Sequence, residues 1–416
     1  MHLIIYTQTY PSSSSVQQPF IERELPYLAQ HFEEITIIPQ VFSGEELSLP
    51  DNVSTETGFS DFYKKQGVLG IIINALRSKY FYQEILQQPS VLLSVKMLLR
   101  LIKFVGDAEI TREWAKNWIE NKSIDISNSL FYSFWFTQIA MGLGLLKEIY
   151  PNIRVIARAH GYDIYEERYS PPYSPCRPKT LKLIDRLFLA SADAHIYMKK
   201  NYPSFSAKYY TAHLGVEASG FISSLSSDDV FRIVSCSSII PLKRVELLAK
   251  SIALMAQIRP NKKIQWIHFG EGPNREKVQK IIGNFLPSIQ GKLYGFTPNI
   301  QILEHYKNHP VDIFVNLSTT EGGAPVSIME AISCGIPVIA TNVGGNPEIV
   351  SEKNGLLLNA DPTLMEIAQA FFKIIDNPEE TFQKRKNSIM IWREQYNAHE
   401  NFENFVQQLA ALVGNN

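Results

Sequence analysis

The second half of the chain alternates short apolar runs with longer segments of helical periodicity. Six of the apolar runs are typical of strands; they cover 232–236, 264–269, 292–294, 313–317, 338–340 and 356–358. Helices are predicted between them, and a final helical region over 364–412. Strands that alternate with helices form parallel sheets covered on both faces. This half is therefore predicted to be a doubly wound α/β domain.

The first half has the same alternation, interrupted by one long helical stretch over 61–122. Strands are predicted at 3–6, 35–38, 124–127, 154–159 and 186–190, with helices at 20–32, 135–150, 179–184 and 192–202. Residues 218–229 are rich in serine and acids and poor in core residues, which is typical of a linker. We therefore predict two Rossmann-like domains, 1–220 and 221–394, each with a doubly wound parallel sheet.

Composition excludes several classes of protein. Forty basic and 41 acidic residues give a net charge of −1, which argues against a global electrostatic grip on nucleic acid. Cys176, Cys236 and Cys334 are too few and scattered for a disulfide framework or zinc cluster, and no metal-binding motif is present. The start resembles no secretory signal, and the apolar runs fall short of the ~20 residues that span a bilayer. We expect a soluble cytoplasmic protein without a metal or cofactor, attached at most to the inner face of a membrane.

The stretch VLLSVKMLLRLIKFVG (91–106) places Lys96, Arg100 and Lys103 on one helical face, with leucine and valine opposite. One interpretation is an amphipathic helix packed on a sheet. The other is a basic face, within about 91–105, that touches anionic lipid at a membrane surface.

Three turns of the second half share one design, in which a strand is followed by glycines and then a proline. They are FGEGP (269–273), EGGAP (321–325) and VGGNP (343–347). Proline favours the first helical position, and glycine allows a ligand to approach the backbone closely. The glycines concerned are Gly270, Gly272, Gly322, Gly323, Gly344 and Gly345. Any one turn could be merely a tight connection, but three together, with Lys243 and Arg244 opening another helix, predict a phosphate or diphosphate site.

Glu330 lies beside this predicted anion site, five residues into the helix that follows Pro325. A carboxylate there repels phosphate, so its expected partner is a pair of hydroxyls, such as those of ribose. The alternative is a solvated helix acid. The chain has no P-loop and no GxGxxG opening a βαβ unit, which leaves those nucleotide-binding classes without support.

The segment STTEGGAPVSIMEAISCGIPVIATNVGGNPEIV (318–350) strongly resembles the donor-binding core of family 4 retaining glycosyltransferases of the GT-B type. HGYD (160–163), SSIIPLKR (237–244) and FGEGP support the resemblance. It implies two Rossmann-like domains that face a central cleft. The N-terminal domain would bind the acceptor and be joined by a C-terminal helix, about 395–416, and the C-terminal domain would bind the nucleotide sugar.

The resemblance also implies roles for individual residues. Glu330 matches the acid that holds the nucleotide ribose, and Glu321 matches the acid that contacts hydroxyls of the donor sugar. Lys243 matches the lysine that neutralises the diphosphate. His160 matches the histidine that reaches the donor sugar near the reacting carbon, and Asp163 accompanies it in the motif.

This chain departs from the family pattern at three places. Eight residues separate Glu321 from Glu330, where seven are usual, so either a bulge absorbs the extra residue or Glu321 is displaced. Ser238 stands where an arginine is usual, and Arg244 is the candidate replacement because a guanidinium can grip phosphate bidentately. The first loop, TYPSSSSVQQP, lacks the family's glycine pair.

The implied reaction transfers a sugar from a nucleotide diphosphate sugar to a hydroxyl acceptor, with retention and without a metal. Surface-polysaccharide or lipid-linked glycan assembly is the expected setting, so a glycan or lipid-linked acceptor is the expected partner. Two alternatives stay open at this point. One is a sugar-nucleotide epimerase or hydrolase, and the other is a catalytically silent protein that binds nucleotide as an assembly component.

Overall fold

The computed structural model describes residues 1–13 and 18–414, which divide into two compact units. Unit 1 comprises Met1–Ala212 and Phe402–Asn416, and unit 2 comprises His213–Asn401. The chain therefore leaves unit 1 at residues 212–213 and returns within its last helix, α16 (Ala398–Gly414). Each unit is described separately below.

Unit 1 contains a parallel sheet of seven strands among the described residues, in the order β3-β2-β1-β4-β5-β6-β7. The strands are β1 (His2–Thr7), β2 (Glu34–Pro39), β3 (Val53–Thr55), β4 (Ser129–Ser133), β5 (Arg154–Ala159), β6 (Arg186–Leu189) and β7 (Tyr209–Thr211). Besides α16, the α-helices are α1 (Gln18–His31), α2 (Gly58–Arg77), α3 (Lys79–Gln87), α4 (Val95–Lys122), α5 (Gln138–Leu145), α6 (Gly161–Ile164), α7 (Arg177–Leu183) and α8 (Ala192–Asn201).

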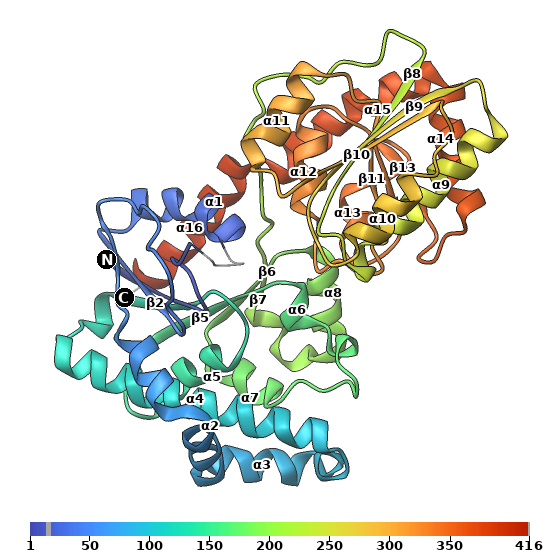
Figure 1. The fold of residues 1–416 in the computed structure, drawn as a ribbon. Coiled ribbons are helices and arrows are strands. Elements are labelled where there is room, and N and C mark those ends of the chain that lie inside the picture. The colour runs from blue at the N-terminus through green and yellow to red at the C-terminus, as the bar shows by residue number, and fades with distance from the viewer. Residues whose placement is uncertain (14–17, 415–416) are drawn as a thin grey trace. The chain divides into compact units, whose positions relative to one another are not determined.

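The central strands of unit 1 are buried on both faces. Successive strand residues point to opposite faces, so Leu3 and Ile5 of β1 join the core with α1 and α16, whereas Ile4 and Tyr6 join the core with α4 and α5. Figure 1 shows α1 and α16 on one side of this sheet and α4, α5 and α7 on the other. This explains why the strand sequences are continuous apolar runs.

One sequence prediction for unit 1 is wrong, and one strand was missed. The strand predicted at 124–127 is a turn with a short 3₁₀ segment, Ile126–Asn128, and the strand itself is β4. The sequence of β4, SLFYS, is wholly buried but begins and ends with serine. Its apolar run is therefore too short to indicate a strand. The edge strand β3 was not predicted, because three residues give too short a pattern to detect.

Unit 2 contains a parallel sheet of six strands among the described residues, in the order β10-β9-β8-β11-β12-β13. The strands are β8 (Val230–Cys236), β9 (Lys263–Phe269), β10 (Ile289–Gly295), β11 (Ile313–Asn316), β12 (Val338–Thr341) and β13 (Gly355–Leu358), which confirms the six predicted runs. The helices are α9 (Val245–Ile258), α10 (Arg275–Ile282), α11 (Asn299–Asn308), α12 (Val326–Ser333), α13 (Asn346–Ile349), α14 (Leu364–Asp376) and α15 (Pro378–Ile391). In Figure 1, α9, α10 and α14 cover one face of the sheet, and α11 and α12 cover the other.

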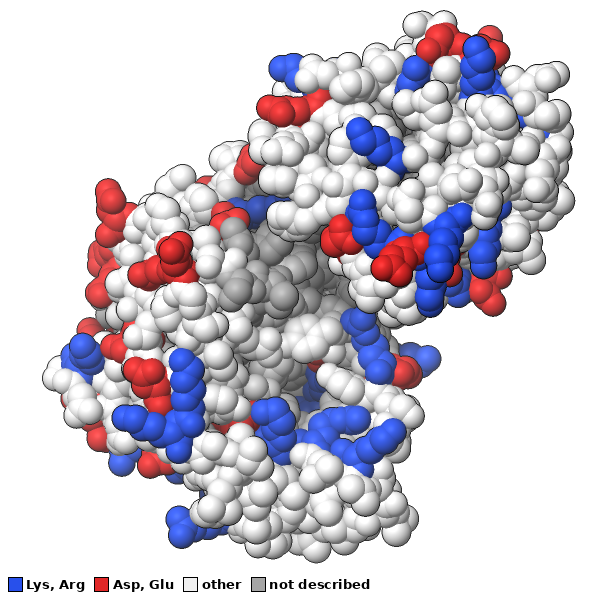
Figure 2. All heavy atoms as spheres, in the orientation of Figure 1, with Lys and Arg blue, Asp and Glu red and all other residues white. Residues whose placement is uncertain are grey.

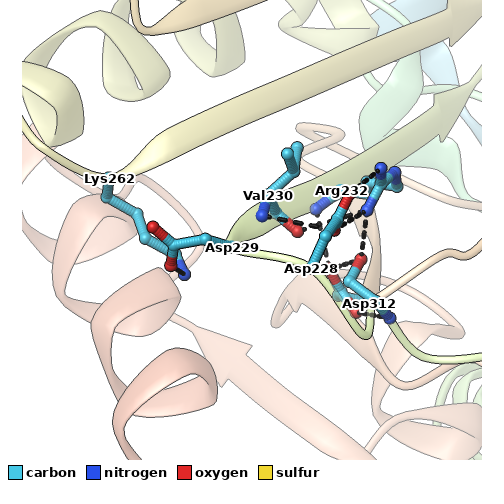
Figure 3. A network of polar contacts seen from close by, with 7 residues as sticks. Asp228, Asp229, Val230, Arg232, Lys262 and Asp312 are labelled. Carbon is cyan, nitrogen blue, oxygen red and sulfur yellow. Dashed lines mark hydrogen bonds and ion pairs between the residues drawn. The ribbon is translucent and has the colours of Figure 1, made fainter.

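The predicted linker, residues 218–229, is instead fastened to unit 2. Asp312, just before β11, accepts hydrogen bonds from the Ser226 amide (2.9 Å), the Ser226 hydroxyl (2.7 Å) and the Arg232 amide (2.8 Å). Arg232 also forms a two-pronged ion pair with Asp228, with N–O distances of 2.6 and 2.8 Å (Figure 3). The serines and acids of this segment therefore form hydrogen bonds with unit 2, and the segment is not a flexible linker.

Candidate functional site

The candidate donor site lies at the carboxyl edge of the unit 2 sheet, where the strand order reverses. The chain builds β9 and β10 on one side of β8, and β11, β12 and β13 on the other. The loops that follow neighbouring β8 and β11 therefore diverge at the top of the sheet, which is where open α/β sheets bind ligands. Lys243 follows β8, and Glu321 follows β11.

Lys243 and Glu321 meet at this point although 78 residues separate them. The Lys243 ammonium lies 2.5 Å from Glu321 Oε1. The same oxygen accepts hydrogen bonds from the Ser318 hydroxyl (2.6 Å) and the Asn316 amide group (3.2 Å). Glu321 Oε2 has no hydrogen-bond partner among the described residues. The cluster therefore holds one carboxylate oxygen firmly and leaves the other able to accept from a ligand.

The loops that carry this pair are fixed by backbone contacts. The Thr319 amide donates to the Leu242 carbonyl (2.8 Å). The Thr341 hydroxyl at the end of β12 donates to the Ser318 carbonyl (2.6 Å). Three neighbouring strands thus position the Lys243–Glu321 pair, and the longer spacing between Glu321 and Glu330 does not remove Glu321 from Lys243.

Two of the three glycine turns pack directly against each other. A Cβ atom at Gly344, where φ is +50°, would lie 1.8 Å from the Glu321 carbonyl oxygen. A Cβ at Gly345 would lie 2.1 Å from the Gly323 carbonyl carbon. Only glycine allows these backbones to approach so closely, so Gly322 and its neighbours are held beside the second turn.

The third turn, FGEGP, packs on the loop after β8. A Cβ at Gly270 (φ +137°) would lie 1.9 Å from the Ser237 carbonyl oxygen, and one at Gly272 would lie 2.5 Å from the Ile239 carbonyl oxygen. The predicted role of the prolines needs correction. Pro325 is an extended N-cap, and Pro273 precedes the Asn274 N-cap, so neither is the first helical residue. Only Pro347 lies in the first turn of its helix, α13, which has four residues.

Glu330 is buried within α12, so it is not a solvated helix acid. Its Oε1 accepts a hydrogen bond from the Asn299 side chain (2.7 Å) at the start of α11. Arg244 lies apart from these acids. Its guanidinium donates to the Ala360 carbonyl (2.8 Å) and pairs with Asp361 (2.9 Å). The structure therefore places Lys243 with Glu321, and it places Arg244 at the loop after β13.

His160 and Asp163 belong to unit 1 and follow β5. Asp163 is buried, and its two oxygens accept the backbone amides of His160 (2.6 Å) and Phe136 (2.8 Å). Burial raises the pKa of Asp163 to about 7, although these amides lower it. The His160 ring packs against Trp135 with a centroid distance of 4.2 Å. Neither ring nitrogen has a partner among the described residues, and burial lowers the pKa of His160 well below its usual range.

Sequence reasoning missed Asn316, Ser318 and Asn299, which hydrogen-bond to the two acids. Asn316 and Ser318 lie at the end of a predicted strand, which is a detectable signal. Asn299 has no local signal, because its contact with Glu330 depends on the packing of α11. Within residues 1–13 and 18–414, no cluster of three His, Cys, Asp or Glu side chains could hold a metal ion, and none of the helices there is long and apolar enough to cross a bilayer.

The fold and this site define a class: two parallel-sheet Rossmann-like units of the GT-B type, with a polar ligand site at the switch point of unit 2. Residues 221–389 match the model of the family described as glycosyl transferases group 1. Over these residues the chain is similar to this family.

Curated relatives match over part of the chain. One component of the phosphatidylinositol N-acetylglucosaminyltransferase of Arabidopsis thaliana is 27% identical over 165 residues, which cover 38% of this chain and 35% of that protein. The human protein of the same name is 30% identical over 151 residues, 35% of this chain and 29% of that protein. The chain thus spans about a third of the length of these relatives.

Solved structures match over nearly the whole chain. A lipopolysaccharide outer core galactosyltransferase superposes with a TM-score of 0.67 at 14% identity, over 98% of this chain and all of that one. The Anabaena protein HepE in complex with UDP superposes with a TM-score of 0.62 at 13% identity, over 99% of this chain and all of that one. These likenesses establish the fold of this chain.

Proposed function

We propose that this protein is a retaining glycosyltransferase, which moves a sugar from a nucleotide diphosphate sugar to a hydroxyl acceptor in the assembly of a lipid-linked or surface glycan. The observation that carries the proposal is the Lys243–Glu321 cluster at the switch point of unit 2, beside the paired glycine turns.

The groups of this site match what the reaction needs. Nucleoside diphosphate departure develops negative charge, which Lys243 and the backbone amides of the glycine turns stabilise. Glu321 Oε2 accepts from a hydroxyl of the donor sugar, and Glu330 accepts from the ribose. The acceptor attacks on the same face as the departing phosphate, and its proton passes to that phosphate. No step needs a metal ion.

The acceptor setting rests on a different observation. The relatives include proteins named for transfer to phosphatidylinositol, and a sulfoquinovosyl transferase of Arabidopsis thaliana. Among residues 62–106 of this chain, seven are basic and one, Glu84, is acidic. In Figure 2 the surface of unit 1 over α2 and α3 is largely uncharged and is bordered by Lys and Arg side chains. This combination fits work at the surface of an anionic membrane.

The test replaces Lys243 with methionine, and Lys250→Met, at an exposed lysine of α9, is the matched control. UDP-, GDP- and ADP-sugars, with and without magnesium, are screened for a shift in melting temperature. The donor that shifts wild type is then used to measure nucleoside diphosphate release with and without bacterial lipid extract. We expect Lys243→Met to lower turnover by about 10²–10³-fold and to change the free energy of unfolding by less than ~1 kcal/mol, because the ion pair is partly exposed.

Two results would contradict the proposal. One is the absence of a shift with every sugar nucleotide. The other is equal turnover in Lys243→Met and Lys250→Met. Release that is equally fast without lipid extract would indicate hydrolysis instead of transfer.

A further inference from the structure

Unit 1 has its own cavity, of about 410 Å³, at the carboxyl edge of its sheet. The strand order reverses between β1 and β4, and the cavity is lined by Gln8 after β1, by Phe136 and Thr137 after β4, and by Asp163 after β5. This is the position at which open α/β sheets bind ligands. The cavity lies entirely within unit 1, so its ligand is recognised by this unit's own side chains.

Arg177, the first residue of α7, gives the cavity a buried and incompletely satisfied cation. The side chain is only 6% exposed. Its Nη2 donates to the Ser174 hydroxyl (2.8 Å), and the guanidinium lies over the Phe136 ring at 4.9 Å from the centroid. Nη1, however, is buried without a hydrogen-bond partner in the described chain. A buried donor of this kind costs free energy until something accepts from it.

Asp163 is near enough for the Arg177 charge to lower the pKa of its carboxyl group, but none of the described side chains accepts a hydrogen bond from Arg177 Nη1. Asp163 lines the same cavity, but its oxygens accept the two backbone amides described above. The Thr137 hydroxyl is a second buried polar group without a hydrogen-bond partner among the described residues. Arg100 adds a second guanidinium, which donates to the backbone carbonyls of Pro171 (3.2 Å) and Tyr173 (2.9 Å) and forms no ion pair with a described acid. A ligand with anionic oxygens would satisfy both orphan groups.

The remaining wall of the cavity is mixed: Leu99, Phe104 and Pro175 are apolar, and Lys103 and Asp107 form an ion pair with each other (2.8 Å). Leu99 of α4 lines the cavity and is 60% exposed. Just before it, Leu92, Leu93 and Val95 are 58%, 89% and 74% exposed. Large apolar side chains so exposed and so close together mark an interaction surface. Because basic residues accompany them, the complementary occupant is an anionic amphiphile and not a neutral apolar one.

We propose that this cavity binds the phosphate of a lipid phosphate or diphosphate acceptor, with Arg177 Nη1 as its principal donor. The apolar chain would lie along Leu99 of α4 and the exposed Leu92 and Leu93 of the 3₁₀ segment before it. That the bound lipid is the acceptor rests on the proposed sugar transfer. That the cavity binds an anionic amphiphile does not depend on that proposal. The assignment narrows the acceptor from any hydroxyl compound to a lipid whose headgroup carries phosphate.

The test measures binding of three probes below their aggregation concentrations: decyl phosphate, decanol and inorganic phosphate. Wild type is compared with Arg177→Met, which keeps an apolar stem on Phe136, and with Arg177→Lys, which keeps the charge. Arg186→Met is the matched control, because Arg186 stacks on Tyr210 away from the cavity. We expect decyl phosphate to bind wild type at least tenfold more tightly than either fragment. Arg177→Met should weaken it by about ten- to a hundredfold, Arg177→Lys less, and Arg186→Met not at all.

Equal binding of decyl phosphate to wild type and Arg177→Met would overturn the assignment. Equal binding of inorganic phosphate and decyl phosphate would overturn its lipid part, because a free phosphate would then suffice. A purely structural Arg177 would lower the melting temperature in Arg177→Met without changing affinity. Sugar-nucleotide shifts should persist in Arg177→Met; their absence even in wild type would refute the proposed function and leave the amphiphile site standing.

Discussion

Replacing Glu321 with glutamine should strengthen the binding of a nucleoside diphosphate while it weakens turnover. In the free protein, the Lys243 ammonium is engaged by Glu321 Oε1 at 2.5 Å. A diphosphate must compete with this carboxylate for Lys243, and it also meets the carboxylate's negative charge. Glutamine keeps an oxygen for Ser318 and Asn316 but removes the charge, so Lys243 becomes fully available to the ligand.

The size of the expected gain in diphosphate affinity follows from the exposure of the Lys243–Glu321 ion pair. The side chains of Lys243 and Glu321 are 21% and 11% exposed, so their attraction is at the upper end of that of a surface ion pair, about 1 kcal/mol. If the ligand no longer has to break this ion pair, its affinity should rise about fivefold. Turnover should fall instead, because Glu321 would no longer supply a charged acceptor to the donor sugar.

The assay is calorimetric titration with the nucleoside diphosphate of whichever donor shifts the melting temperature. Glu271→Gln is the control, since Glu271 also pairs with a base (Arg275, 2.8 Å) beside a glycine turn of unit 2. Unchanged or weaker affinity in a folded Glu321→Gln protein would refute the reasoning, because Lys243 would then not be the group that meets the diphosphate.

Two further predictions concern unit 1. Comparison with Asp163→Asn should show that Asp163 makes the stability of the protein depend on pH. Burial raises the pKa of Asp163 from 3.8 to about 7, so the folded state binds the carboxyl proton more tightly than the unfolded chain does. The stability that the protonated carboxyl group contributes is therefore lost as the pH rises from about 4 to 7. The excess of wild-type unfolding free energy over Asp163→Asn, from urea titrations, should therefore be larger at pH 5 than at pH 7.5; no change would contradict it, and Asp61→Asn at an exposed acid is the control. Replacing Leu92 and Leu93 with serine should lower sedimentation with phosphatidylcholine–phosphatidylglycerol (70:30) vesicles by several-fold relative to wild type. Equal sedimentation would mean that the 3₁₀ segment Pro89–Leu93 does not meet the membrane.

The fold could be predicted from the sequence because its strands are buried on both faces. Such strands are unbroken apolar runs between glycines and polar turns, as in Ile313–Asn316 and Val338–Thr341. The strand prediction failed where buried residues are polar or where apolar residues lie outside a strand. β4 is buried but starts and ends with serine, whereas Ile124 and Ile126 are apolar but belong to a turn.

The candidate donor site was predictable in its composition but not in its contacts. Glycine turns after strands indicate a ligand edge, and topology brings Lys243 and Glu321 to it. No sequence pattern shows that Glu321 pairs with Lys243 or that Arg244 turns to Asp361, because these choices depend on loop packing. Arg177 was missed altogether, since a lone arginine before a proline has no periodicity, and its significance lies in burial without a partner.

The two units use the same position of a doubly wound sheet for different chemistry. At the strand-order reversal of unit 2, a charged pair and closely packed glycine backbones form a polar surface suited to a diphosphate and its sugar. At the reversal of unit 1, a buried guanidinium and aromatic rings form a cavity of about 410 Å³ that continues into exposed leucines. An apolar chain is not stabilised at the polar surface of unit 2, whereas the unit 1 cavity offers a guanidinium for an anionic headgroup and apolar side chains for a chain. Under the proposed functions, donor and acceptor therefore bind to different units and do not compete, as a transferase requires.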